Sequence, residues 1–278
     1  MTNSESFSKR HGFHQENPPI SIWEDAPDDF RSALLQVAAD DCGLSPDDLR
    51  SVVCKVLRKK PDPNNWSPYP NIWQEVEWHI ESCPWFKVYD IIEAIWKKLD
   101  HKHVTKNGGY EAAQPIFEAE VTALMAELGI GWKLEDGFIQ ARGEESYEEH
   151  LQMATEALEK ANKPTAISEL KEAIGDISRR PVPDTSGAIQ HAMAALECVA
   201  RDAAQDPKPT LGALIKKHPD LFPKPVDNAI EKLWGYASEN ARHGREGNAP
   251  TREEAMLVVG VSATLVNYLM HKIPLSGH

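Results

Sequence analysis

A polar segment near residue 240 gathers the side chains best suited to chemistry in this sequence. Residues 234–250 read WGYASENARHGREGNAP and join the end of one predicted helix to the start of the last one. Arginine can bind two phosphate oxygens at once and stabilise charge that develops on them, and histidine can exchange a proton near neutral pH. The candidate catalytic residues of this segment are Glu239, Asn240, Arg242, His243 and Arg245.

This combination suits the cleavage of an RNA phosphodiester. Arg242 and Arg245 would stabilise the phosphate, and His243 would act as general base or general acid. Asn240 and Glu239 would orient these groups. RNA carries its own nucleophile, the 2′-hydroxyl, so the reaction requires no metal, and we predict no cofactor.

A purely structural interpretation of the same segment stays open. Arginine and histidine in the last turn of a helix interact favourably with the negative end of the helix macrodipole. Gly244 follows Arg242 and His243 directly, and glycine commonly ends a helix.

A second group of candidates lies in residues 187–202, GAIQHAMAALECVARD. His191 or Glu197 could support the pair Arg242–His243 across a helical bundle, and Arg201 is the i,i+4 partner of Glu197. The alternative is a core histidine with satisfied hydrogen bonds and a surface ion pair.

Aromatic side chains are frequent in the first third of the chain. They could stack on nucleic-acid bases. Their helical spacing among isoleucines and valines favours a role in the core instead. They are Trp66, Tyr69, Trp73, Trp78, Trp85, Phe86, Tyr89 and Trp96.

Several classes of protein lose support from the composition of the 278 residues. The net charge of −13 argues against broad electrostatic coating by nucleic acid, although a local basic site stays possible. Motifs for P-loop nucleotide hydrolysis, serine hydrolysis and zincin chemistry are absent. The four cysteines form no CxxC pair, so we expect reduced, buried thiols without a zinc site. We see no secretory signal and no apolar run of membrane-spanning length, and we therefore expect a cytoplasmic protein.

The hydrophobic periodicity is almost entirely helical. Ser45-Pro46-Asp47-Asp48 is a helix start signal, and Thr251 with Glu254 forms a capping box. Asp136-Gly137 within residues 131–141 predicts one small β-hairpin. The predicted fold class is all-α, with a helical N-terminal domain (1–145) that carries this hairpin and a C-terminal helical bundle (146–278). The predicted helices cover residues 28–42, 45–59, 72–82, 85–99, 114–128, 147–160, 165–178, 186–204, 211–217, 225–243 and 251–272.

The N-terminal region resembles an AbiJ-type N-terminal domain. The resemblance is carried by FSKRHGF, LSPDDLRSVVCKVLRKKPDPNNWS, PNIWQEVEWHIESCPWFKVYDIIEAIW and LGIGWKLEDGFI. The C-terminal region resembles the HEPN-type helical domains of bacterial abortive-infection proteins, through GAIQHAMAALECVARD, ENARHG and the capped apolar last helix.

The resemblance implies a helical domain that dimerises and cleaves RNA without metal, in defence against phage. The pattern of that family places an arginine about four to six residues before a histidine. In this sequence Arg242 immediately precedes His243, and Arg245 follows it. His243, Gly244 and Asn240 match the pattern, and Arg242 is the nearest available arginine.

Two functions follow as alternatives. The first is a metal-independent ribonuclease effector of abortive infection that forms a homodimer through its C-terminal domain and acts on RNA. The second is a non-catalytic HEPN module that binds RNA or a partner protein as a sensor or scaffold, with a phage or defence-system protein as the partner. The adjacent Arg242 and His243 and the acidic composition favour the second.

Overall fold

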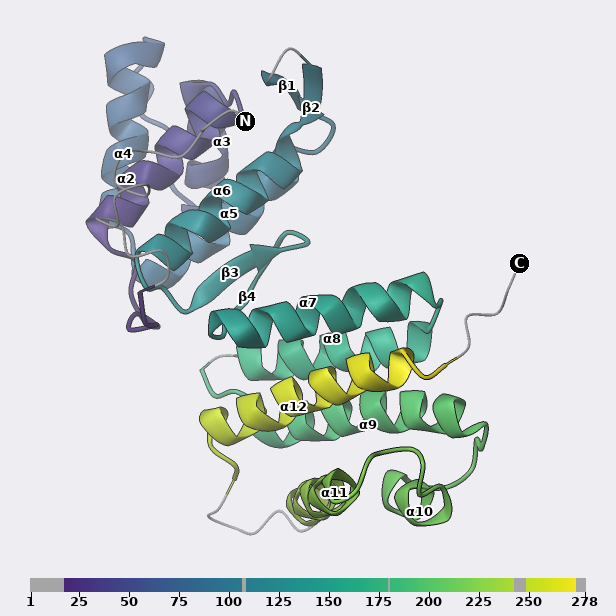
Figure 1. Cartoon of the computed structure of the whole chain (residues 1–278). Coiled ribbons are helices and arrows are strands. Elements are labelled where there is room, and N and C mark those ends of the chain that lie inside the picture. The colour runs from purple at the N-terminus through teal and green to yellow at the C-terminus, as the bar shows by residue number, and fades with distance from the viewer. Residues whose placement is uncertain (1–17, 107–108, 180, 243–248, 274–278) are drawn as a thin grey trace, which may run out of the picture. The chain divides into compact units, whose positions relative to one another are not determined.

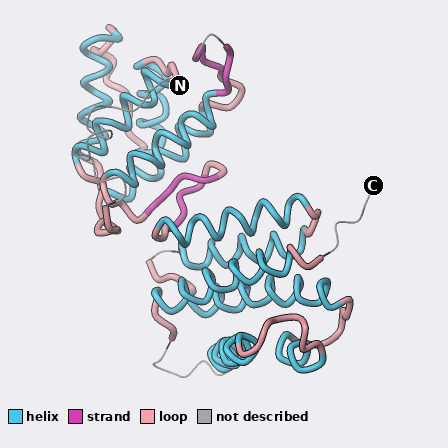
Figure 2. The backbone as a smooth tube through the Cα atoms, in the orientation of Figure 1, coloured by secondary structure: helices cyan, strands magenta, loops and turns pink. Residues whose placement is uncertain are grey.

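The chain divides into two compact units between residues 142 and 143 (Figure 1). The computed structural model describes residues 18–106, 109–179, 181–242 and 249–273, without the side chains of Lys106 and residues 240–242. Unit 1 is Met1–Arg142 and unit 2 is Gly143–His278. Helices dominate both, and the strands described form two small hairpins (Figure 2). The predicted all-α fold class is confirmed.

The helices of unit 1 begin and end close to the predicted positions. At the start of α3, Ser45 Oγ accepts a hydrogen bond from the Asp48 backbone N–H at 3.1 Å, and the Asp48 carboxylate accepts one from the Ser45 N–H. Arg58 ends that helix in the left-handed conformation. The helices are α2 (Asp28–Gln36), the π-helix η1 (Val37–Asp41), α3 (Pro46–Leu57), the π-helix η2 (Pro68–Ile72), α4 (Trp73–Ser82), α5 (Trp85–Lys98) and α6 (Ala113–Glu127).

The predicted hairpin is confirmed as strands β3 (Trp132–Glu135) and β4 (Phe138–Ala141). Asp136 and Gly137 take positive φ angles of 51° and 78°, as a two-residue type I′ turn requires. A second hairpin, β1 (His103–Lys106) with β2 (Gly109–Ala112), was not predicted. All four residues of β2 are exposed, so the alternation of apolar and polar residues that reveals a half-buried strand is missing.

A buried arginine joins α2 to the corner between α4 and α5. Arg31 is 6% exposed, and its guanidinium donates hydrogen bonds to the backbone carbonyls of Ala26, Ile80 and Cys83. Ile80 and Cys83 lie at the C-terminal end of α4, where no helical N–H is available to their carbonyls, and Ala26 precedes the start of α2. Arg31 therefore fixes the position of the α4–α5 corner against α2.

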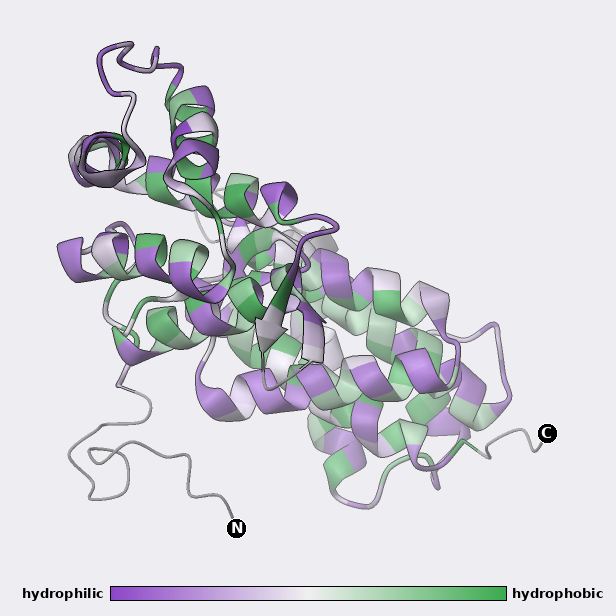
Figure 3. Ribbon diagram, turned by 90° about the horizontal axis from the view of Figure 1, so that it is seen from above, coloured by the Kyte–Doolittle hydropathy of each residue, from purple (hydrophilic) through white to green (hydrophobic). Residues whose placement is uncertain are grey.

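Unit 2 is a helical bundle with α9 and α12 in its centre. Helix α9 lies against α8, α10, α11 and α12, while α12 lies against α7, α8 and α9. Hydrophobic and hydrophilic residues alternate along the helices in Figure 3, as expected for helices that bury one face. The helices are α7 (Glu145–Lys160), α8 (Pro164–Ser178), α9 (Thr185–Ala204), α10 (Leu211–Lys217), α11 (Val226–Arg242) and α12 (Arg252–Met270).

Among the described residues, one helix, α12, has the length and the apolar composition that crossing a membrane would require. Its position against three helices of the bundle accounts for this composition, because such a helix buries more than one face. The predicted capping box at its start is confirmed, with Thr251 Oγ1 accepting from the Glu254 N–H and the Glu254 carboxylate accepting from the Thr251 N–H.

Replacing Arg31 tests how far its hydrogen bonds stabilise unit 1. We expect Arg31→Met to lower the free energy of unfolding by about 2–4 kcal/mol, because it leaves buried carbonyls without donors. Tryptophan fluorescence in urea measures this, since seven of the eight tryptophans lie in unit 1. The control is Lys87→Met, which removes a surface ion pair with Asp90 and should cost less than about 1 kcal/mol. Equal losses in both variants would contradict the role of Arg31.

Candidate functional site

The segment predicted to be catalytic begins at the C-terminal end of α11. Glu239 is exposed near this end. The backbone of Asn240 and Arg242 belongs to the last turn of α11, while their side chains, and all of His243 and Arg245, lie outside the described residues. The convergence of these five residues therefore stays a prediction.

The two helices that flank this segment contact one another. The hydroxyl of Tyr236, on α11, is hydrogen-bonded to the carboxylate of Glu254 in the first turn of α12. Burial raises the pKa of Tyr236, and the negative charge of Glu254 raises it further. On the other side of α11, the ring of Trp234 lies against Gly212 of α10, where an added Cβ would stand 2.9 Å from the ring. Helix α11 is thus held between α10 and the start of α12.

His191 lies in an ionisable cluster at the junction of α8 and α9. Its Nδ1 is 2.7 Å from a carboxylate oxygen of Glu169, and its Nε2 is 3.8 Å from one of Asp176. Asp176 is 1% exposed, and its burial raises the pKa of the carboxyl. Arg179 Nη2 approaches the other Asp176 oxygen at 2.8 Å. The imidazole of His191 therefore lies between the carboxylates of Glu169 and Asp176.

The backbone of Asp176 also gives this cluster a structural role. The carbonyl of Asp176 accepts the Asp184 N–H at 2.9 Å, and Asp184 then caps α9 by accepting the Gly187 N–H at 2.8 Å. A Cβ at Gly187 would stand 2.4 Å from Asp176, so only glycine allows this approach. The cluster therefore also fixes the start of α9 against the end of α8.

Glu197 and Arg201 form the expected i,i+4 ion pair at 2.6 Å. Glu197 also accepts the Leu211 N–H at 2.8 Å, and Arg201 Nε donates to the Pro209 carbonyl at 2.9 Å. Both side chains thereby hold the connection between α9 and α10. Whether they also support His243 stays a prediction.

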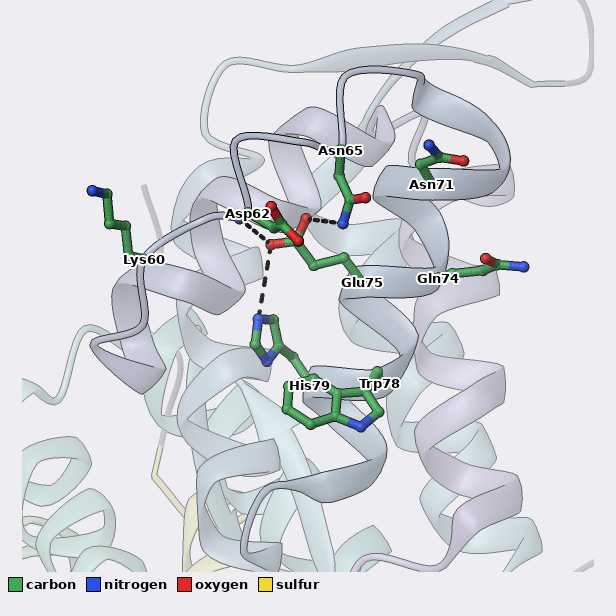
Figure 4. A pocket seen from close by; sticks show the side chains of 8 residues that line it. All are labelled: Lys60, Asp62, Asn65, Asn71, Gln74, Glu75, Trp78 and His79. Carbon is green, nitrogen blue, oxygen red and sulfur yellow. Dashed lines mark hydrogen bonds and ion pairs between the residues drawn. The ribbon is translucent and has the colours of Figure 1, made fainter.

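Unit 1 contains a pocket that the sequence did not reveal. Its volume is about 520 Å³, within the range of small-molecule sites. One face of η2 and α4 forms one side, and the segment after α3 forms the other (Figure 4). The residues that line it are Lys60, Asp62, Asn65, Asn71, Gln74, Glu75, Trp78 and His79.

The side chain of Glu75 organises this pocket. It is 6% exposed and accepts the Asp62 backbone N–H at 2.9 Å and the Asn65 side-chain amide at 3.0 Å. Arg50 Nη1 of α3 stands 3.6 Å from the same carboxylate, and His79 Nε2 stands 3.9 Å from it. Figure 4 shows Asp62, Asn65, Glu75 and His79 pointing toward one another, whereas Lys60 and Gln74 point outward on opposite sides.

Cys54, Glu75 and His79 bring three metal-binding atoms within 4.8 Å of one another. Their surroundings do not suit a metal ion. Burial and the nearby Glu75 raise the pKa of the Cys54 thiol, which disfavours the thiolate that binds metal. The Lys59 ammonium lies 3.2 Å from His79 Nδ1, which must therefore accept a hydrogen bond and leaves the proton on Nε2. Glu75 and His79 are instead hydrogen-bonded to groups outside this trio, Glu75 to Asp62 and Asn65 and His79 to Lys59.

The pocket escaped prediction because its parts are distant in sequence. Residues 74–79 supply four of the eight lining side chains. Glu75 and His79 are four residues apart and therefore share one face of a helix, and this spacing was the signal in the sequence that could have indicated the site. The expectation that the aromatic residues form the core was wrong for Trp66, Tyr69, Trp78 and Phe86, which are exposed. Trp78, 59% exposed, lines the pocket.

Comparison with known proteins adds one family. Residues 5–157 match the family model described as AbiJ N-terminal domain 4, which covers more than half of the chain. This match spans unit 1 and continues into α7. No curated protein and no solved structure matches the chain.

The pH dependence of stability tests the environment of His79. Burial, and secondarily the Lys59 charge, lowers the pKa of His79 below its ordinary 6.5. Below that pH the unfolded chain binds a proton that the folded chain does not, so His79 stabilises unit 1 above pH 6.5 and this contribution is lost as the pH falls. We expect the stability of wild type to fall by up to about 1 kcal/mol more than that of His79→Gln between about pH 7.5 and 5.5.

The measurement is urea unfolding followed by tryptophan fluorescence at each pH. Titrating carboxyl groups elsewhere contribute equally to both proteins, so the difference isolates His79. Parallel pH curves for the two proteins would contradict a depressed pKa at this position.

Proposed function

The chain belongs to the AbiJ N-terminal domain 4 family, and from that premise we propose that it is an effector of abortive infection whose C-terminal unit is a HEPN-type, metal-independent ribonuclease. The family supports a role in abortive-infection defence. The ribonuclease activity is supported by the segment after α11 and by the helical architecture of unit 2. The protein would act in the cytoplasm, where transcripts are available.

The observation that carries the ribonuclease proposal is the hydrogen bond between Tyr236 and Glu254. It joins Tyr236, six residues before the end of α11, to the first turn of α12. The proposal requires that Arg242, His243 and Arg245 lie in one restricted region, and a contact between the two flanking helices favours this.

The proposed reaction is an internal transfer at phosphorus. His243 takes the proton from the 2′-hydroxyl, whose oxygen then bonds to phosphorus while the bond from phosphorus to the 5′-oxygen breaks. The departing 5′-oxygen takes up a proton from water, and the products are a 2′,3′-cyclic phosphate and a 5′-hydroxyl. Arg242 and Arg245 stabilise the charge that builds on the phosphate oxygens, and Asn240 with Glu239 orients them.

A homodimer through unit 2 would complete this proposal. Two copies of the segment would then contribute to one cleft, and the arginine of one copy could serve the histidine of the other. His191 would support the group if the dimer brought the α8–α9 junction close to it.

A non-catalytic module is the competing function. The adjacency of Arg242 and His243 favours it, because the arginine that precedes the histidine in the resembled pattern is displaced. Such a module would bind RNA or a phage or defence-system protein and leave RNA intact. Its RNA binding would weaken with rising salt concentration, without the appearance of product.

Cleavage of RNA in excess EDTA tests the proposal directly. We expect wild type to produce fragments with 2′,3′-cyclic phosphate ends, and His243→Ala to lose at least about a hundredfold in rate, the range for loss of a general acid or base. The matched control is His271→Ala, which removes an exposed histidine just after α12 and should cleave like wild type.

Growth of cells that express each variant gives a second readout. The wild type and His271→Ala should arrest growth, while His243→Ala should not. Salt-sensitive RNA binding without fragments would favour the non-catalytic module. Unchanged cleavage by His243→Ala would exclude the mechanism described above.

A further inference from the structure

A basic stretch lies next to the pocket of unit 1, in a chain whose net charge is −13. It runs from α3 into the loop that follows and contains no acidic residue between positions 49 and 61. Its basic residues, all exposed except the first, are Arg50, Lys55, Arg58, Lys59 and Lys60. A local positive surface of this kind attracts phosphate groups that the rest of the molecule repels.

The side chains that line the pocket are of two kinds: some hold the fold, and others are available to a ligand. The acceptors of Glu75 are occupied by donors from Asp62 and Asn65, as described above. The side chains of Asn71, Gln74 and Lys60, by contrast, make no hydrogen bond or ion pair with any described residue. An amide group presents a donor and an acceptor side by side, which is the pattern that pairs with the edge of a nucleobase.

Trp78 provides a flat apolar surface at the same pocket. Its side chain is 59% exposed although it is large and apolar, and it lines the pocket on the same helical face as Gln74 and Glu75. The Lys59 ammonium lies 4.7 Å from the centre of the indole ring. An indole beside a lysine can stack on a base while the lysine meets the adjoining phosphate.

We propose that the pocket between the segment after α3 and the face of η2–α4 binds a nucleobase together with its phosphate. The base stacks on Trp78, and its edge pairs with the amide of Asn71 and, after a change of rotamer, with that of Gln74, whose side chain points outward in Figure 4. The phosphate is bound by Lys59 and by Lys60, whose outward-pointing side chain must likewise turn toward the ligand. This site lies in unit 1 and goes beyond the proposed ribonuclease function, on which it does not depend.

The charges distinguish this ligand from a carbohydrate. A neutral sugar ring also stacks on tryptophan and pairs with amides, but it carries no negative charge for the lysines to neutralise. The position of Lys59 over the indole and of Lys60 at the pocket rim is therefore the feature that favours a phosphorylated ligand. The same base and phosphate can come from a free nucleotide or from an unpaired base of single-stranded RNA.

Two binding measurements separate these sources. The first titrates AMP, GMP, CMP and UMP, with adenosine as the ligand that lacks phosphate, and follows the heat of binding. The second follows the anisotropy of a fluorescein-labelled single-stranded RNA of about ten nucleotides. Both use the full-length chain that carries His243→Ala, so that any nuclease activity that depends on this residue is removed. The outcome for the binding site is then independent of the outcome for the proposed ribonuclease.

The test variant is Trp78→Ala, and its matched control is Phe138→Ala. Phe138 is 57% exposed in the same unit and has the Lys97 ammonium 5.6 Å from its ring, but it does not line the pocket. We expect the Kd of at least one probe to rise about tenfold or more in Trp78→Ala, and to stay within about twofold in Phe138→Ala. If Trp78→Ala weakens the binding of a mononucleotide, the ligand is a free nucleotide. If it weakens the binding of the oligonucleotide alone, the ligand is single-stranded RNA.

A second variant tests the phosphate. Lys60→Glu should weaken AMP binding about tenfold and leave adenosine binding unchanged if a nucleotide is the ligand, and should weaken binding of the labelled RNA if RNA is the ligand. Equal Kd values for Trp78→Ala and its parent, or no binding of any probe at about 1 mM, would overturn the proposal. Binding of maltohexaose that depends on Trp78, without nucleotide binding, would overturn it in favour of a carbohydrate.

Discussion

The buried carboxylate of Glu75 is the constraint on which the pocket of unit 1 depends. A carboxylate removed from water is costly unless donors surround it, so its partners must remain within hydrogen-bonding distance. These partners come from α3, which supplies Arg50, and from the loop after it, which supplies Asp62 and Asn65. Arg50 also donates to the Asn65 carbonyl at 2.7 Å. The loop is therefore fixed, although it has no regular structure, and the groups at the pocket rim are left available.

In unit 2 the polar groups likewise hold connections between helices. The carboxylate of Glu197 and the backbone carbonyl of Asp176 hold helix connections in place, while the centre of the bundle is apolar. Ser262, 1% exposed on α12, is an exception that bonds to the sulfur of Met193. On α9 the side chains of His191, Glu197 and Arg201 are engaged in ion pairs, so we place the proposed chemistry at the end of α11 and in the segment that follows it.

The features that the sequence predicted correctly are those that local interactions determine. Asp136-Gly137 specifies a turn by its own backbone preferences, and Thr251 with Glu254 closes a capping box within four residues. The hairpin β1–β2 lacked such a signal, because its second strand is wholly exposed. The pocket depends on residues up to 29 positions apart, from Arg50 to His79, and no local pattern encodes that proximity. Helical spacing likewise could not show that Trp78 faces solvent. The periodicity of apolar residues indicates a helix, but it does not by itself identify which face is buried.

The position of α7 relates the family match to the bundle. The match ends at residue 157, inside α7, although α7 belongs to unit 2. Tyr147 of this helix lies against Gly260 of α12, where an added Cβ would stand 3.0 Å from the ring. Because close-packed interiors do not deform gradually, a shift of α7 must alter its contact with α12. Helix α12 begins directly after the predicted catalytic segment. The family match therefore includes the first part of a helix that packs against α12 in unit 2.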